Sequence, residues 1–143
     1  MAEKPRFSTF YLDRLFFGID VEKVQEVLRC QDITHVPLAP SVVRGLINLR
    51  GQIVTAIDLR RRLGLSECAA CQFPISLVVR TGDGVVSLLV DDIGEVVEVD
   101  EGTFEPPPET LDPKSRALIS GVYKLSDRLM HVLDADQTLK FAT

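Results

Sequence analysis

The sequence lacks the marks of several protein classes. It has no tryptophan, two tyrosines, two methionines and three cysteines in 143 residues. No apolar run approaches the roughly 20 residues that a membrane-spanning helix needs, and no signal-peptide core follows the N-terminal residues. We therefore predict a cytoplasmic protein that does not insert into the membrane.

Cysteine is scarce, and its odd count favours free thiols over a disulfide framework. Cys68 and Cys71 have the C-x-x-C spacing, which could chelate zinc or cycle as a dithiol. Zinc would need two further ligands, and the chain offers only Cys30, His35, His131 or a carboxylate. The residues around the pair are typical of a loop. We predict plain loop cysteines, and a thiol or metal protein using Cys68 and Cys71 is the less favoured alternative.

The second half of the chain has little positive charge. Residues 1–65 hold ten Lys or Arg and seven Asp or Glu, whereas residues 66–143 hold six and fourteen. Nine carboxylates and no basic residue lie between Asp91 and Pro113. We interpret this run as a solvated face, with a docking surface for a basic partner as the alternative. The net charge of -5 argues against a nucleic-acid partner.

No catalytic arrangement is present in the sequence. His35 lies in a proline-flanked connection and His131 in a strand at the sheet surface, and neither has a partner at a spacing that predicts a general base. The adjacent carboxylates Asp91 and Asp92 would point to opposite faces of a strand. No phosphate-binding glycine motif and no H-E-x-x-H occurs. We predict no enzyme, no catalytic residue, no cofactor and no bound metal.

The sequence does contain many short segments of strand character, in a chain that is 45% hydrophobic. Alternating apolar residues and turn residues predict hairpins, and Asp20 is a plausible N-cap for one helical turn. Proline-rich connections separate the strands. The expected strands are 7–12, 15–19, 25–30, 75–80 and 85–90, a strand after Asp92, and hairpins within 45–58 and 121–134. The expected helices are 21–24, 59–63 and 134–141.

An internal repeat organises these segments. Residues 20–27 match residues 92–99 as D-[VI]-x-[KE]-V-x-E-V, and residues 45–58 align without a gap on residues 121–134. The chain is thus two copies of one unit of about 70 residues. We predict a single domain, 1–143, with repeat units 7–65 and 74–143 that each form one barrel. The fold class is all-β, two small five-stranded barrels packed together with short helices, which hides sheet edges.

The repeat also isolates one arginine. Arg50 lies in the turn of the first long hairpin, and its counterpart in the second copy is Ser126. Since the unit tolerates serine there, Arg50 is more plausibly specialised than structural. Glu26 has a counterpart in Glu98, and a guanidinium can hold a carboxylate bidentately. We predict an ion pair between Glu26 and Arg50, with a solvated Arg50 as the alternative.

The sequence resembles the CheW family of chemotaxis coupling proteins from about residue 7 to residue 141. The resemblance rests on Gly-Ile-Asp-Val at 18–21, Val-Gln-Glu-Val at 24–27, Val-Pro-Leu-Ala-Pro at 36–40, Val-Arg-Gly-Leu-Ile-Asn-Leu-Arg-Gly at 43–51 and Ile-Asp-Leu-Arg at 57–60. Two features depart from the family pattern, the C-x-x-C and the basic run at 60–62. A helix that closes the barrel could simply leave this basic run in solvent.

Membership would imply two intertwined five-stranded SH3-like barrels, no catalysis and no cofactor. It would imply an adaptor that joins the cytoplasmic tip of methyl-accepting chemoreceptors to the regulatory domain of a CheA-type histidine kinase, recruited to the inner face of the membrane through receptors. A groove with Val24, Val27 and Ile53 exposed near Arg50 would seat an amphipathic helical tip. The residues that match family contact and coupling positions are Val24, Glu26, Gly45, Arg50 and Ile53. An alternative is the same fold in a non-swimming chemosensory pathway such as gliding, twitching or development.

Overall fold

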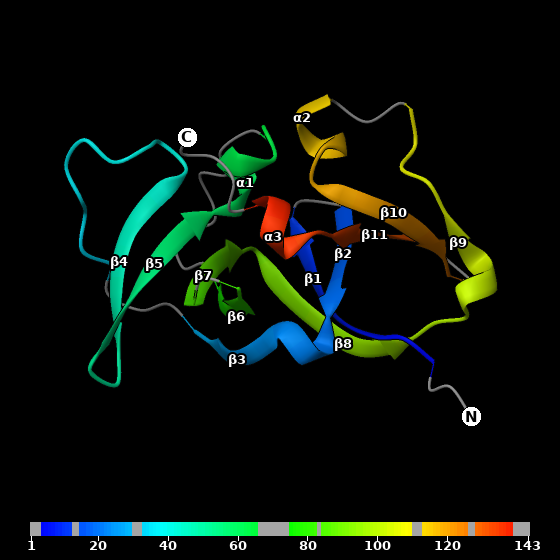
Figure 1. Cartoon of the computed structure of the whole chain (residues 1–143), viewed down its shortest axis with the longest axis horizontal. Coiled ribbons are helices and arrows are strands. Elements are labelled where there is room, and N and C mark those ends of the chain that lie inside the picture. The colour runs from blue at the N-terminus through cyan, green and yellow to red at the C-terminus, as the bar shows by residue number, and fades with distance from the viewer. Residues whose placement is uncertain are drawn as a thin grey trace.

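A computed structural model describes residues 4–12, 15–29, 33–65, 75–82, 84–109, 113–125 and 128–138. Strands dominate these residues, and the helices are short (Figure 1). The strands are β1 (Arg6–Leu12), β2 (Leu15–Asp20), β3 (Val24–Leu28), β4 (Val43–Leu49), β5 (Gln52–Asp58), β6 (Ile75–Thr81), β7 (Gly84–Val90), β8 (Asp92–Glu98), β9 (Phe104–Glu105), β10 (Ile119–Lys124) and β11 (Leu129–Leu133). The helices are the 3-10 turns η1 (Val21–Lys23) and η2 (Glu101–Thr103), with α1 (Leu59–Arg62), α2 (Pro113–Arg116) and α3 (Ala135–Thr138). The predicted all-β class is confirmed.

The strands form two sheets that exchange hairpins. The first sheet has the order β3-β6-β7-β5-β4, and the second has the order β8-β1-β2-β11-β10-β9. The hairpin β1–β2 from the first half therefore lies in the second sheet, and β6–β7 from the second half lies in the first. Parallel pairs join each exchanged hairpin to its host, β7 with β5 and β2 with β11. The two units are intertwined, as the family resemblance implied.

Strand pairing thus crosses the predicted repeat units. The bounds 7–65 and 74–143 stay a prediction about the sequence repeat, but neither sheet is built from one unit alone. The sheets nevertheless match strand for strand, with β3, β6, β7, β5 and β4 equivalent to β8, β1, β2, β11 and β10. The first sheet contains β3 and the hairpin β4–β5 of the first unit together with the first hairpin, β6–β7, of the second unit. The second sheet contains β8 and the hairpin β10–β11 of the second unit together with the first hairpin, β1–β2, of the first unit.

Each sheet closes on itself where the chain leaves its edge strand. After β3, Thr34 forms a bridge with Leu46 of β4, the opposite edge strand, through two backbone hydrogen bonds of 2.8 Å. After β8, the two-residue strand β9 pairs with β10 at the equivalent place. Part of one edge strand in each sheet, β4 and β10, is therefore paired by its own chain, as expected for small barrels.

The hydrophobic core consists of one shared cluster between the sheets and one cluster inside each barrel. Alternate residues of the exchanged hairpins divide between them. On β6, Leu77 and Val79 belong to the shared cluster, whereas Val78 lies inside the first barrel. On β2, Phe17 belongs to the shared cluster and Phe16 to the second barrel. The exchanged strands are buried on both faces, which accounts for their continuous apolar runs.

Most local predictions are confirmed, with small shifts in bounds. Asp20 caps η1, since its Oδ1 accepts a hydrogen bond of 3.0 Å from the Glu22 amide. The segment after it is strand β3, as the repeat predicted. The last helix spans Ala135–Thr138 within the described residues, and its predicted continuation to residue 141 lies outside them. Cys30, Cys68 and Cys71 also lie outside the described residues.

The basic run of α1 is not left in solvent, contrary to the simple interpretation of its sequence. Arg60 is buried and forms a bidentate ion pair with Asp91, with Nε 2.9 Å from Oδ1. The side chain of Arg61 donates to the Ser41 carbonyl, and that of Arg62 donates to the Thr138 carbonyl at the end of α3. Because Asp91 separates β7 of the first sheet from β8 of the second, the Arg60 pair clamps the crossing between the barrels.

Two equivalent glycines allow the closing segments to approach. A Cβ on Gly45 would lie 2.3 Å from the Thr34 carbonyl oxygen, and a Cβ on Gly121 would lie 2.2 Å from the Phe104 ring. Gly45 also has a φ of 154°, which side chains rarely adopt. Since both copies keep this glycine, its requirement comes from barrel closure.

Replacing Gly45 should therefore weaken the fold. We expect Gly45→Ala to lower the free energy of unfolding by about 1–3 kcal/mol, because the added methyl overlaps a backbone oxygen that is fixed by two hydrogen bonds. Urea denaturation followed by circular dichroism measures this loss. Gly102→Ala is the matched control, since a Cβ there meets nothing within 4 Å. Equal stability of the Gly45 variant and the control would refute the closure role.

Candidate partner-binding site

The first long hairpin presents Arg50 in a constrained turn. Leu49 of β4 pairs with Gln52 of β5, so Arg50 and Gly51 form a two-residue connection. Their φ angles are 53° and 87°, and positive φ at both positions is the signature of a type I′ turn. Asparagine, aspartate and glycine are the residues favoured there. An arginine in the left-handed region carries a conformational cost of order 1 kcal/mol or more, which local contacts must offset.

The predicted ion pair between Arg50 and Glu26 is confirmed. Nη1 of Arg50 lies 2.9 Å from Oε2 of Glu26, and Nη2 lies 2.8 Å from Oε1, so the pair is bidentate. The side chain of Arg50 is 72% exposed, whereas that of Glu26 is 18% exposed. Glu26 belongs to β3, an edge strand, and the turn of Arg50 joins β4 and β5 at the other edge of the same sheet. The pair therefore spans the closure of the first barrel and offers one face of the guanidinium to solvent.

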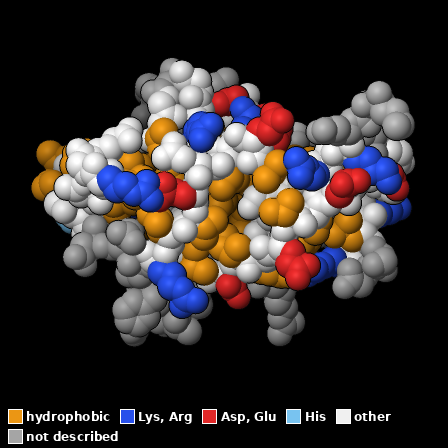
Figure 2. Space-filling model, turned by 90° about the horizontal axis from the view of Figure 1, so that it is seen from below, with side chains coloured by type: hydrophobic (Ala, Val, Ile, Leu, Met, Phe, Trp, Pro, Cys, Tyr) orange, Lys and Arg blue, Asp and Glu red, His pale blue; other side chains and the backbone are white. Residues whose placement is uncertain are grey.

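Apolar side chains accompany this pair. Ile53, one residue into β5 from the turn, is 61% exposed, and Val27, next to Glu26 on β3, is 43% exposed. Val24 differs from the expectation, since it is half-buried and packs against the shared core. Figure 2 shows hydrophobic side chains gathered in the middle of the lower face of the molecule, with charged groups around them. The edge strands β3 and β8 run along this side (Figure 1).

Gly45 does not present a surface, because it is buried beneath the closing segment. Its place in the family pattern therefore has a structural explanation. Of the five predicted positions, Glu26 and Arg50 contact each other directly, and Ile53 lies exposed beyond the same turn. Val24 packs against the cluster shared by the two barrels, and Gly45 lies buried under the closing segment.

The second hairpin does not reproduce the ion pair. Arg128, at the start of β11, places its guanidinium carbon 3.9 Å from the centre of the Phe16 ring and donates to the Tyr11 hydroxyl. Glu98, the counterpart of Glu26, lies opposite Arg6 in the pairing of β1 with β8. The contact between Glu26 and Arg50 is thus a property of the first barrel alone.

Sequence reasoning missed one residue of this hairpin. The Asn48 side chain accepts a hydrogen bond of 2.8 Å from the Gly51 amide, within the turn that holds Arg50. The signal was available in the repeat, because the counterpart of Asn48 is Lys124. The comparison that singled out Arg50 also singles out Asn48.

The other predicted polar groups have structural contacts. Three members of the acidic run form ion pairs, Asp91 with Arg60, Asp100 with Lys4 and Glu105 with Lys124. The hydrogen bond to Asp100 raises the pKa of Lys4 above its usual value. His35 is exposed in its connection. His131 is half-buried on β11, with Nδ1 3.1 Å from the Phe16 carbonyl oxygen.

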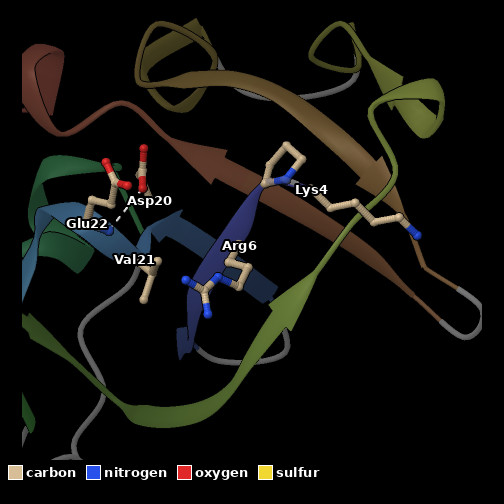
Figure 3. A pocket seen from close by; sticks show the side chains of 6 residues that line it. Lys4, Arg6, Asp20, Val21 and Glu22 are labelled. Atoms are coloured by element: carbon tan, nitrogen blue, oxygen red, sulfur yellow. Dashed lines mark hydrogen bonds between the residues drawn. The ribbon is translucent and has the colours of Figure 1, made fainter. Parts of the chain in front are cut away.

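A shallow depression of about 190 Å³ lies beside the start of β1 (Figure 3). Its lining contains both basic and acidic side chains, and the Asp20 carboxylate already accepts a hydrogen bond at the start of η1. The charges of the lining therefore do not indicate a ligand of either sign. The lining residues are Lys4, Pro5, Arg6, Asp20, Val21 and Glu22.

The described ranges contain no group of three or more His, Cys, Asp or Glu side chains placed to hold a metal ion. None of the helices in the described part of the chain is long and apolar enough to cross a membrane. The described surface combines a bidentate ion pair with an exposed arginine and exposed apolar side chains on the same strands. Such a surface on a pair of small barrels is typical of non-catalytic proteins that bind other proteins.

Comparison with known proteins narrows this class to one family. The family model described as CheW-like domain matches residues 6–142, and the chain belongs to this family. CheW-family proteins are non-catalytic adaptors of chemotaxis, so the prediction of a non-enzyme is confirmed.

Individual relatives agree with this membership. A chemotaxis protein CheW from Bacillus subtilis is 31% identical, over 94% of this chain and 86% of that protein. Protein FrzA from Myxococcus xanthus is 28% identical, over 81% of this chain and 72% of that protein. The crystal structure of the scaffolding protein TtCheW from Thermoanaerobacter tengcongensis has a TM-score of 0.82 and 31% identity, covering 92% of this chain and 89% of that one. The predicted SH3-like fold class is confirmed.

The two bidentate arginine pairs should differ in their effect on stability. We expect Arg60→Ala to lower the free energy of unfolding by about 1.5–3 kcal/mol, because the Arg60 side chain is only 8% exposed and its charge-assisted hydrogen bonds to Asp91 are lost inside the crossing between the barrels. Arg50→Ala should lower it by less than about 1 kcal/mol, because the Arg50 side chain is 72% exposed. Chemical denaturation of both variants measures the difference. Similar losses in the two variants would contradict the assignment of a structural role to Arg60 and a surface role to Arg50.

Proposed function

We propose that this protein is the adaptor that couples methyl-accepting chemoreceptors to a CheA-type histidine kinase. The observation that carries the proposal is the pair between Arg50 and Glu26. It is exposed, held in one geometry, and absent from the second barrel, so barrel formation does not require it. An exposed, preorganised guanidinium suits recognition of another protein more than it suits stability.

The surroundings of the pair fit a helical partner. Ile53, beyond the turn on β5, and Val27, on the opposite face of β3 from Glu26, supply exposed apolar area on the strands that carry the pair. An amphipathic helix would bury its apolar stripe on such residues, and its polar groups would take their register from Arg50. The cytoplasmic tip of a chemoreceptor is the partner that we assign to this surface. The regulatory domain of the kinase docks barrel to barrel.

The proposed contact set keeps the five predicted positions but divides their roles. Glu26, Arg50 and Ile53 meet the partner, whereas Val24 and Gly45 hold the shape of the first barrel. In this proposal the protein acts in the cytoplasm, where receptors recruit it to the inner face of the membrane. It needs no cofactor and binds no nucleic acid.

Loss of the guanidinium should weaken coupling without unfolding the protein. We expect Arg50→Ala to weaken binding of a receptor signalling fragment or of the kinase regulatory domain at least about fivefold, the effect of removing a central arginine from an interface. Kinase stimulation in a reconstituted receptor–kinase assay should fall with it. Isothermal titration calorimetry with each partner separately shows which contact is lost.

Arg116→Ala is the matched control, since Arg116 is an exposed arginine of α2, a helix that contacts β10 of the second sheet. It should bind both partners as the wild type does. If the wild-type protein bound neither partner, the proposed function would be wrong. If the Arg50 and Arg116 variants behaved alike, the site would be wrong while the function stood.

A second candidate keeps the fold and changes the pathway. The similarity to Protein FrzA is compatible with this alternative, a chemosensory pathway for gliding, twitching or development. The same surface would then serve receptors and a kinase of that pathway. Deleting the gene and scoring swimming and surface motility separately distinguishes the two.

A further inference from the structure

The turn that carries Arg50 has one amide that the hairpin itself does not satisfy. The ladder between β4 and β5 ends at Leu49 and Gln52, so the Gly51 amide lies beyond the last pair. Asn48 Oδ1 accepts a hydrogen bond from this amide at 2.8 Å. Such a side-chain bond favours the local turn over other backbone conformations. It acts on the two residues with positive φ, Arg50 and Gly51.

Asn48 is placed to act on the turn and not on the core. It is exposed on β4, opposite the exposed Ile53, while its neighbours Ile47 and Leu49 point into the first barrel. A fold requirement for an amide at this position is therefore weak. The left-handed φ of Arg50, in contrast, needs a compensating contact.

The second hairpin supplies an independent observation. Its residue at the position of Asn48 is Lys124, which pairs with Glu105 at 3.0 Å. Its residue at the position of Arg50 is Ser126. The amide and the guanidinium are thus present together in one copy and absent together from the other. A hairpin of this unit forms without either of them.

We propose that Asn48 is a positioning residue for the contact between Arg50 and Glu26. Its amide oxygen holds the Gly51 amide, which keeps Arg50 left-handed, and this backbone conformation aims the guanidinium across the barrel closure at Glu26. The protein then presents the ion pair to its partner in one preorganised geometry. The partner-binding consequence rests on the proposed function, whereas the positioning of Arg50 is a property of the free protein.

Nuclear magnetic resonance of the Arg50 side chain tests the positioning directly. In the free wild-type protein, a bidentate pair should give Arg50 guanidinium signals distinct from those of a solvated arginine. Asn48→Ala should move them toward the solvated position, and Asn48→Asp, which keeps an acceptor, should restore them. Lys124→Ala, at the same position of the second hairpin, should leave them unchanged. Wild-type signals in Asn48→Ala would overturn the proposal.

A binding cycle tests the consequence. Asn48→Ala should weaken partner binding about fivefold, the size of one neutral hydrogen bond, in a protein that has Arg50. In the Arg50→Ala background the same change should alter binding less than twofold, because Asn48 acts through Arg50. Fully additive losses would show that Asn48 acts independently and would overturn the proposal. If the wild type binds no partner, the proposed function fails and the Arg50 spectra still decide the positioning role.

Discussion

Burial of the exchanged hairpins on both faces is the constraint on which the rest of the structure depends. Strands β1, β2, β6 and β7 each place alternate side chains in a barrel interior and in the cluster shared by the two barrels. Neither half can therefore complete its barrel or cover its apolar surface without the other. The shared cluster packs the two barrels against each other, and the Arg60 and Asp91 ion pair holds the point where the chain crosses between them.

Barrel closure then creates the site. The close approach of Thr34 to β4, which Gly45 permits, brings the β3 side of the first sheet round toward the β4–β5 hairpin. Arg50 and Glu26 consequently face each other although their strands are at opposite edges of the sheet. The exposed pair contributes little to stability, so its geometry is available for recognition. Burial distinguishes the two arginines of these ion pairs, since the Arg60 side chain is 8% exposed and that of Arg50 is 72% exposed.

Hairpins and caps were predictable because their determinants are local. The Asp20 cap, the turn at Arg50 and Gly51, and the alternating strands follow from neighbouring residues. The contact between Glu26 and Arg50 was also predictable, since the repeat marked Arg50 as unnecessary for the fold. The exchange of hairpins is reflected in the sequence only as continuous apolar runs such as Leu77 to Val79. A strand with one face in solvent would alternate apolar and polar residues, so such a run indicates burial on both faces.

Some roles could not be predicted locally, because they depend on partners far away in the chain. The basic run of α1 has the composition of a solvated helix, yet Arg60 and Arg62 bind groups 31 and 76 residues away. Gly45 belongs to the family motif, and the close approach of the Thr34 carbonyl explains why this position is a glycine. The sequence by itself determined the class, the strands, the repeat and the pairing of Arg50 with Glu26, because these follow from periodicity, local turn chemistry and the comparison of the two copies. Only the tertiary structure decided which hairpin completes which barrel and which charges are buried, because both depend on surfaces that exist only once the two halves have closed around each other.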